Sequence, residues 1–215
     1  MLRRRVSIRR QHLPPATRAL PKTDVAPSAS ARKVRYAALL VLALVAVAIY
    51  AIDQVTKYLV VANLTQYERV PLLGDFLQLY FVKNPGAAFS IGSGTTWIFA
   101  IIASAVVVFI VIFSRRIRSL GWAVLFGLLL GGNAGNLTDR LTREPGFGIG
   151  HVVDFIQLWI FPAIFNIADM AIVFSMVIFV ILTIRGVRLD GSRTVKPVPD
   201  APATLDDASA TTDSQ

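Results

Sequence analysis

Four long apolar segments constrain this chain more than any other feature of its sequence. They span residues 36–52, 97–113, 120–138 and 165–184, and the one charged residue within them is Asp169. Each segment approaches the roughly 20 residues that a helix needs to cross about 30 Å of hydrocarbon. Because the lipid core offers the backbone no hydrogen-bond partners, we expect each segment to be a membrane-spanning helix.

The composition favours membrane spans over the alternative, a soluble protein with buried helices. Hydrophobic residues make up 54% of the 215 residues and charged residues 16%, whereas soluble domains carry about 25% charged residues. Four buried helices in so short a chain would leave too little polar surface to cover them. We therefore predict an all-α membrane protein in which residues 36–184 form a domain of four transmembrane helices.

The net charge of +9 is concentrated near the ends of the chain. Residues 1–35 hold 10 of the 22 lysines and arginines but only one acid, so the charge does not indicate a folded face that binds nucleic acid. This segment is rich in Arg, Pro, Ala and Ser without apolar periodicity, and we predict a disordered basic tail. A transit peptide is the competing interpretation. Residues 185–215 are also polar, and we predict a second disordered tail there.

Basic residues flank the apolar segments and set the expected orientation. They are Arg32, Lys33, Arg35, Arg115, Arg116, Arg118, Arg185, Arg188, Arg193 and Lys196. With four spans they all fall on one side, which the positive-inside rule makes cytoplasmic, together with both termini. The connections at 62–96 and 139–164 then lie outside. Within them, residues 76–83 and 152–158 favour strands, which we expect at the outer membrane surface.

Polar side chains gather at the outer ends of the predicted spans, where an ionisable residue is costly and therefore a functional hypothesis. Asp53 and Lys57 lie one helical turn apart. They either form a pair that reaches the membrane interface or belong to a site, and the sequence leaves both open. Asn136, Asp139 and Arg140 cluster at the end of the third span, a pattern typical of a site and its supports.

Two aspartates, Asp154 and Asp169, stand among apolar neighbours in the second half of the chain. Taken singly, Asp154 would be an exposed loop acid and Asp169 a partner of the helix dipole. The short link between them could bring their carboxyl groups together, and two close carboxyl groups share one proton. The ionised group can then take a proton from water while the neutral group hydrogen-bonds a carbonyl. Such a pair hydrolyses a peptide without a covalent intermediate.

Other chemistries find less support in the sequence. A Ser/His/Asp triad would need His12, in the tail, or His151, which has no serine motif nearby. The absence of cysteine and of an H-E-x-x-H motif argues against a metal site. A proton-coupled transporter would place polar groups near the bilayer midplane. A membrane scaffold would leave the two aspartates unexplained, and an aspartyl protease of the presenilin type would need a G-x-G-D block.

Five sequence blocks occur in a fixed order along these spans. They are 53–57 (DQVTK), 84–90 (NPGAAFS), 135–140 (GNLTDR), 152–155 (VVDF) and 165–169 (FNIAD). Together they resemble the signature blocks of the lipoprotein signal peptidase family (signal peptidase II), over residues 36–184. Two departures are Asn133, where a small residue is expected, and the Gly-rich stretch at 142–149.

The resemblance implies a membrane aspartyl endopeptidase of the bacterial cytoplasmic membrane. Such enzymes remove the signal peptide from diacylglyceryl-modified prolipoproteins by cutting before the lipidated cysteine. The strands would form a small extracytoplasmic β-cradle that receives the lipidated substrate. The expected partners are these substrates and membrane lipids, with no nucleic acid, no cofactor and no metal, and the chain is expected to be a monomer.

The resemblance also assigns roles to individual residues. The expected catalytic pair is Asp154 and Asp169. The residues expected to bind substrate or to support the pair are Asn84, Asn136, Arg140 and Asn166. Those expected to support the structure of the site are Asp53, Lys57 and Asp139.

Overall fold

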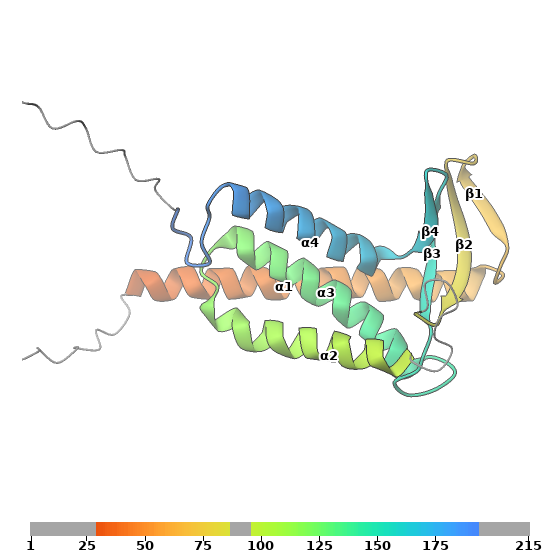
Figure 1. The fold of residues 1–215 in the computed structure, drawn as a ribbon, viewed down its shortest axis with the longest axis horizontal. Coiled ribbons are helices and arrows are strands. Elements are labelled where there is room, and N and C mark those ends of the chain that lie inside the picture. The colour runs from red at the N-terminus through yellow and green to blue at the C-terminus, as the bar shows by residue number, and fades with distance from the viewer. Residues whose placement is uncertain (1–28, 87–95, 194–215) are drawn as a thin grey trace, which may run out of the picture.

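Four long helices and one small sheet make up the part of the chain that the structure describes. The computed structural model describes residues 29–86 and 96–193, in which the helices run side by side and the sheet lies across one end of the bundle (Figure 1). The helices are α1 (Ala29–Asn63), α2 (Thr96–Phe113), α3 (Leu120–Thr142) and α4 (Ile167–Ile184). All four are long and apolar enough to cross a membrane, which confirms the predicted number and place of the spans.

The ends of the bundle differ from the predicted boundaries. Helix α1 begins at Ala29, inside the predicted tail, because the segment that follows Pro27 contains no proline or glycine to interrupt a helix. Residues 185–193 also belong to the folded part, since Leu189 O accepts hydrogen bonds from the backbone N–H groups of Arg118 and Ser119 at 2.9 and 3.0 Å. The rest of the predicted tails, 1–28 and 194–215, lies outside the described residues.

Glycines let α3 pack closely against its neighbours. Gly127, Gly131 and Gly135 recur every four residues on the face toward α1, a spacing that suits close helix contact in lipid. A Cβ atom at Gly131 would lie 2.6 Å from Ala46 O, so any side chain there would push the helices apart. Gly132 faces α4 in the same way, since a Cβ atom added there would lie 2.6 Å from Ala168 O. These close approaches bring the polar ends of α1, α3 and α4 together.

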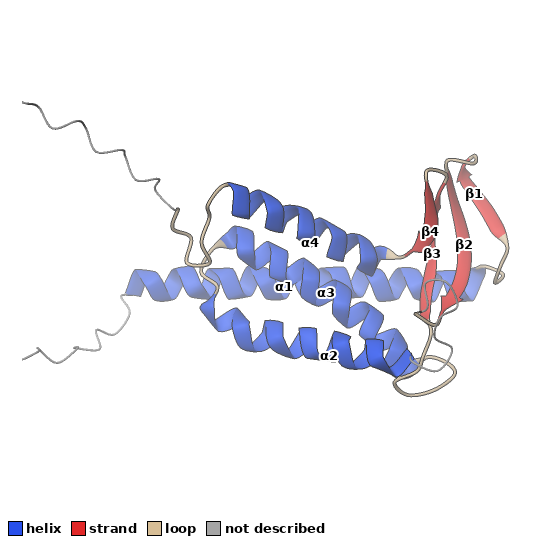
Figure 2. Ribbon diagram, viewed as in Figure 1, coloured by secondary structure: helices blue, strands red, loops and turns tan. Residues whose placement is uncertain are grey.

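The sheet is antiparallel, with strands in the order β1-β2-β3-β4 (Figure 2). Its strands are β1 (Arg69–Leu73), β2 (Leu77–Asn84), β3 (Val152–Leu158) and β4 (Phe161–Phe165). The predicted strand residues 76–83 and 152–158 correspond to β2 and β3, whereas β1 and β4 were not predicted. Residues 161–164 fall within the predicted second connection, and the fourth span, expected from residue 165, begins instead at Ile167.

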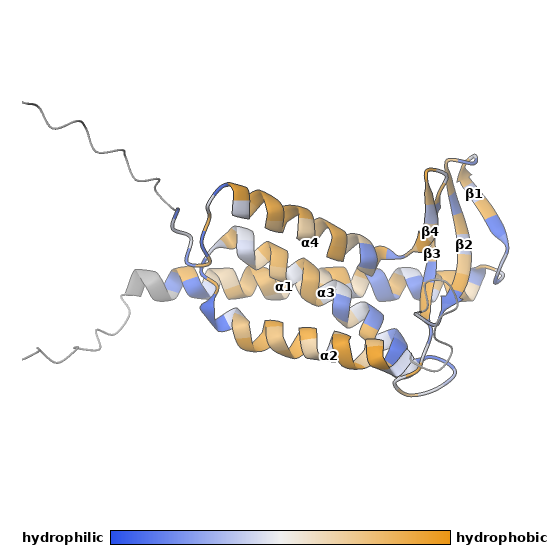
Figure 3. Ribbon diagram, viewed as in Figure 1, coloured by the Kyte–Doolittle hydropathy of each residue, from blue (hydrophilic) through white to orange (hydrophobic). Residues whose placement is uncertain are grey.

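The sheet is joined to the bundle by an apolar cluster beneath it. Val60 at the end of α1 packs with Phe81 of β2 and with Val153 and Phe155 of β3, and all four are buried. Because side chains alternate along a strand, Asp154 does not join this cluster, and its carboxylate instead accepts hydrogen bonds from Asn84 and from Asn166 at the start of α4. Figure 3 shows that the middle of each helix is apolar and that polar residues collect near the sheet. The fold therefore places a polar site between the helix ends and the sheet.

Candidate active site

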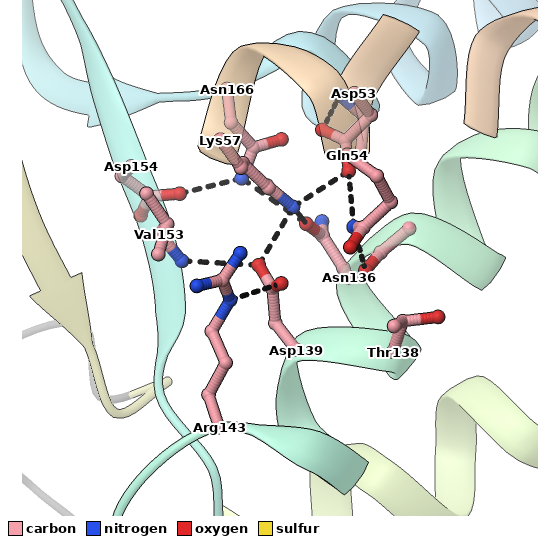
Figure 4. A network of polar contacts seen from close by, with 12 residues as sticks. Asp53, Gln54, Lys57, Asn136, Thr138, Asp139, Arg143, Val153, Asp154 and Asn166 are labelled. Atoms are coloured by element: carbon pink, nitrogen blue, oxygen red, sulfur yellow. Dashed lines mark hydrogen bonds and ion pairs between the residues drawn. The ribbon is translucent and has the colours of Figure 1, made fainter. Parts of the chain in front are cut away.

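The predicted site residues converge where the bundle meets the sheet. Figure 4 shows six of them: Asp53, Lys57, Asn136, Asp139, Asp154 and Asn166. Asp154 lies on β3, Asp169 in the first turn of α4, and Asn166 immediately before that helix. Asn136 comes from α3 and Asn84 from the end of β2. Four separate segments of the chain, β2, α3, β3 and the start of α4, thus contribute to one cluster.

Asp154 is enclosed and receives two amide hydrogen bonds. Only 2% of the surface of Asp154 is exposed. Asn84 Nδ2 donates to Oδ2 at 2.7 Å and Asn166 Nδ2 donates to Oδ1 at 2.6 Å. Burial raises the pKa of Asp154 to about 7, and the negative charge of Asp169 adds to this, while both amide donors and Lys57 oppose it. Asp154 can therefore hold a proton near neutral pH.

Asp169 is held by the start of α4. Asn166 and Asp169 form a capping box, in which Asp169 N–H donates to Asn166 Oδ1 at 3.0 Å and Asn166 N–H donates to Asp169 Oδ2 at 3.1 Å. Asn136 Nδ2 donates to Asp169 Oδ1 at 2.8 Å. Both carboxylate oxygens accept hydrogen bonds, and the positive end of the helix dipole stabilises a negative charge at this position.

Asn166 connects the two aspartates. Its side-chain amide donates to Asp154 and accepts from the backbone of Asp169, and it also donates to Asn136 Oδ1 at 3.1 Å. The residue is completely buried. One amide thus contacts both members of the predicted pair, which the short link between them was expected to bring together.

Lys57 lies behind this cluster in a fully enclosed ionic network. Its Nζ contacts Asp53 Oδ2 at 2.8 Å, Asp139 Oδ2 at 2.9 Å and Asn136 Oδ1 at 2.9 Å, and both ion pairs are 0% exposed. The Asp53–Lys57 pair forms, and both of its side chains are fully buried within the protein. It contacts Asn136, which itself holds Asp169.

The acids of this network also hydrogen-bond to the backbone of α4 and β3, which are distant from them in the sequence or lie in another element. Asp53 Oδ1 accepts from the Ala168 N–H of α4 at 3.0 Å, and Asp139 Oδ2 accepts from the Val153 N–H of β3 at 3.2 Å. Arg143 Nε donates to Asp139 Oδ1 at 2.6 Å. Arg143 was not singled out from the sequence, although its place four residues after Asp139 is a signal for such a pair.

Arg140 lines a hollow on one side of the pair. The residue is 9% exposed, and its Nη1 has no hydrogen-bond partner among the described residues. Its guanidinium group lies 5.2 Å from the centre of the Phe99 ring. With Asn84 and Asp154 it borders a hollow of about 550 Å³. An unpaired guanidinium group there can donate to an oxygen of a bound molecule.

A second hollow, of about 410 Å³, opens beside Asp169. The rest of its lining is apolar: Leu158, Phe161, Phe165, Met170, Val173 and Phe174. The two aspartates therefore border different hollows, one with polar groups and one suited to a hydrocarbon chain. Within residues 29–86 and 96–193, no group of three His, Asp or Glu side chains is arranged to hold a metal ion.

Two solved structures share this architecture, and both are of bacterial membrane enzymes. One, at 2.3 Å resolution, is 31% identical, covers 71% of this chain and 93% of that chain, and has a TM-score of 0.59. The other, at 1.9 Å resolution, is 33% identical, covers 66% of this chain and 91% of that chain, and has a TM-score of 0.59. The fold is therefore that of a multi-pass bacterial membrane enzyme.

The family follows from the sequence comparisons. The family described as Signal peptidase (SPase) II matches residues 45–185. The lipoprotein signal peptidase of Leifsonia xyli is 57% identical over 83% of this chain and 82% of its own length. The lipoprotein signal peptidase of Rhodococcus jostii is 43% identical over 80% of this chain and 87% of its own length. That of Streptomyces coelicolor is 47% identical over 78% of this chain and 80% of its own length. The chain belongs to the signal peptidase II family, a family of peptidases that process prolipoproteins.

Proposed function

We propose that Asp154 and Asp169 are the catalytic pair with which this chain removes the signal peptide from diacylglyceryl-modified prolipoproteins, cutting before the lipidated cysteine. The observation that carries the assignment is the single buried amide of Asn166, which bonds to both residues.

The surroundings of the two aspartates favour different protonation states. Asp154, whose pKa is about 7, carries the shared proton and donates it in a hydrogen bond to the scissile carbonyl. Asp169, at the N-terminal end of α4, takes a proton from the attacking water. The water oxygen bonds to the carbonyl carbon. The C–N bond then breaks as the proton on Asp169 passes to the leaving nitrogen, and Asp154 recovers its proton from the hydroxyl group.

The two hollows fit the two kinds of group in such a substrate. The apolar hollow beside Asp169 suits hydrocarbon. Arg140, with an unpaired Nη1, can donate to a peptide carbonyl in the hollow beside Asp154. Asn84 and Asn136 then serve to hold the carboxyl groups in place, whereas Asp53, Lys57 and Asp139 hold the helices that carry them.

The orientation belongs to the same proposal. Arginines are concentrated at the end of the bundle opposite the sheet, in the link at 114–119 and in residues 185–193. The positive-inside rule makes that end cytoplasmic, with both termini. The pair then faces the extracytoplasmic side of the bacterial cytoplasmic membrane, where water reaches a substrate whose signal helix stays in the lipid.

Single substitutions test the pair. Asp154→Asn and Asp169→Asn should each lower cleavage of a diacylglyceryl-prolipoprotein in proteoliposomes by about 10²–10⁴-fold, the usual contribution of acid–base groups. Asp75→Asn, at an exposed turn of the sheet, is the control and should retain activity. Normal cleavage by both dyad variants would show that the assignment is wrong. Wild-type activity should also fall as the pH rises through about 7, because Asp154 then loses its proton.

A further inference from the structure

A groove lies at the end of the bundle opposite the sheet, remote from the aspartates. It has a volume of about 700 Å³ and is lined by Phe109, Phe113, Arg116, Trp122, Phe126, Arg188, Leu189 and Asp190. One wall is the segment that follows α4. Trp122 Nε1 donates to Val187 O at 3.0 Å and so fixes this wall to α3. The groove is therefore built from α2, α3 and an anchored chain segment.

Stacked aromatic rings form the apolar part of the groove. The Phe109 and Phe113 rings stack with centres 5.3 Å apart, and Phe113 meets Phe126 at 5.8 Å. Trp122 stacks on Phe126 at 6.0 Å. A tryptophan near a helix end, such as Trp122, is typical of the membrane–water interface. This surface suits the upper part of an acyl chain.

Two guanidinium groups border the same groove. Arg116 and Arg188 are exposed, and no ion pair involves either of them among the described residues. The guanidinium group of Arg116 lies 5.8 Å from the centre of the Phe113 ring, so charge and aromatic surface are adjacent. Figure 3 shows the polar link at this end next to the apolar body of α2.

The charge around the groove is strongly positive. Residues 114–119 and 185–193 contain six arginines and one acid, Asp190. The carboxylate of Asp190 lines the groove, but its Oδ1 already accepts from Ser192 N–H at 2.9 Å and from Ser192 Oγ at 2.7 Å. The groove thus combines apolar surface with positive charge at one level of the membrane.

We propose that this groove binds one anionic phospholipid, with its phosphate between Arg116 and Arg188 and an acyl chain against the aromatic rings. Guanidinium groups bind phosphate with charge-assisted hydrogen bonds, and basic pockets between transmembrane helices bind acidic lipid headgroups. Residues 194–215, the other candidate occupant, contain four acids but no aromatic residue to fill the apolar wall. The site is independent of the proposed catalytic pair.

Tryptophan fluorescence can report on the groove directly. The chain has three tryptophans. Trp97 at the start of α2 and Trp159 between β3 and β4 lie at the sheet end, so a Trp97→Phe, Trp159→Phe background leaves Trp122 as the probe. In liposomes, phosphatidylglycerol brominated on its acyl chains should quench Trp122 more strongly than equally brominated phosphatidylcholine at the same mole fraction.

A charge-matched pair of double variants separates a site from general surface attraction. Arg116→Gln with Arg188→Gln should weaken the preference for phosphatidylglycerol by about fivefold per arginine. Arg115→Gln with Arg193→Gln removes the same charge outside the groove lining and should keep most of the preference. If the double variant fails to fold by circular dichroism, the two single variants decide.

Three outcomes would overturn the proposal. Equal quenching by both lipids would mean that the groove does not select an anionic headgroup. An equal loss in the control pair would mean that the attraction comes from the membrane surface charge alone. Quenching that appears only after residues 194–215 are removed would assign the groove to that segment instead.

Discussion

The ammonium group of Lys57 donates to the side-chain oxygen of Asn136 over 2.9 Å. Because this contact turns the amide oxygen toward Lys57, the amide nitrogen is turned toward Asp169, to which it donates at 2.8 Å. The buried ionic network therefore sets the direction of a hydrogen bond at the proposed catalytic pair. Lys57 acts on Asp169 through Asn136 without touching it.

Replacing Lys57 should destabilise the protein strongly. Lys57→Met leaves Asp53 buried without its cation and leaves Asp139 with Arg143 alone, which costs on the order of 3–5 kcal/mol. Lys83→Met is the matched control, because the Lys83–Glu144 pair is exposed and such pairs contribute about 0–1 kcal/mol. Thermal unfolding in detergent measures both. Similar losses from the two variants would contradict the view that the network holds the bundle together.

Removing the Asn136 amide should lower activity more than stability. Asn136→Ala deletes the donor to Asp169, and a hydrogen bond to a charged group contributes about 1.5–3 kcal/mol, or roughly 10–100-fold in rate if it is expressed in the transition state. Asn133→Ala, on the same helix, is the control, since Asn133 donates to Leu129 O one turn earlier. Cleavage rates compared at equal folded fraction give the result. A rate for Asn136→Ala equal to that of the control would remove Asn136 from the site.

The raised pKa of Asp154 should make stability depend on pH. Between the ordinary value of 3.8 and about 7 the folded state keeps a proton that the unfolded state loses. The stabilisation that Asp154 gives through this proton is fully present below pH 3.8. It is lost as the pH rises to about 7, at up to about 1.4 kcal/mol per pH unit. Asp154→Asn cannot titrate, so its stability relative to wild type should improve across this window. Denaturant unfolding of both proteins measures the difference, and a pH-independent difference would contradict the shifted pKa.

A methyl group at Gly131 should separate α1 from α3. The added Cβ would lie 2.6 Å from the backbone oxygen of Ala46, and overpacking of this kind costs about 1–3 kcal/mol. Gly146→Ala is the control, because a Cβ there would lie 3.9 Å from Ile149, an ordinary contact. Unfolding in detergent should show a loss for Gly131→Ala only. Equal stability of the two variants would mean that the helices can move apart without cost.

The helices could be predicted from the sequence because each is an uninterrupted apolar run of membrane length. The strand β4 could not, since its five residues are as apolar as the helix that follows and show no alternation. The signal that separates them is Asn166, whose side chain caps α4. The start of α1 was missed for the opposite reason, because residues 29–35 are polar and yet continue the helix.

The members of the site could be named from the sequence, but their partners could not. Spacing placed Asp53 beside Lys57 and Asn136 beside Arg140, since both pairs lie one turn apart. Contacts between helices depend on how closely the backbones approach and on rotation about each axis. For that reason the position of Lys57, between Asp139 and Asn136, emerges only in the folded structure.

The capping box makes the folding of α4 and the geometry of the site depend on the same two residues. Asn166 and Asp169 cap the start of α4, and both also belong to the site, where Asn166 donates to Asp154 and Asp169 accepts from Asn136. A mutation at either position that excluded an inhibitor from the site would also loosen the first turn of a membrane span. Resistance to compounds that contact these two side chains should consequently be hard to acquire, because the altered enzyme would have to insert and fold before it could survive selection.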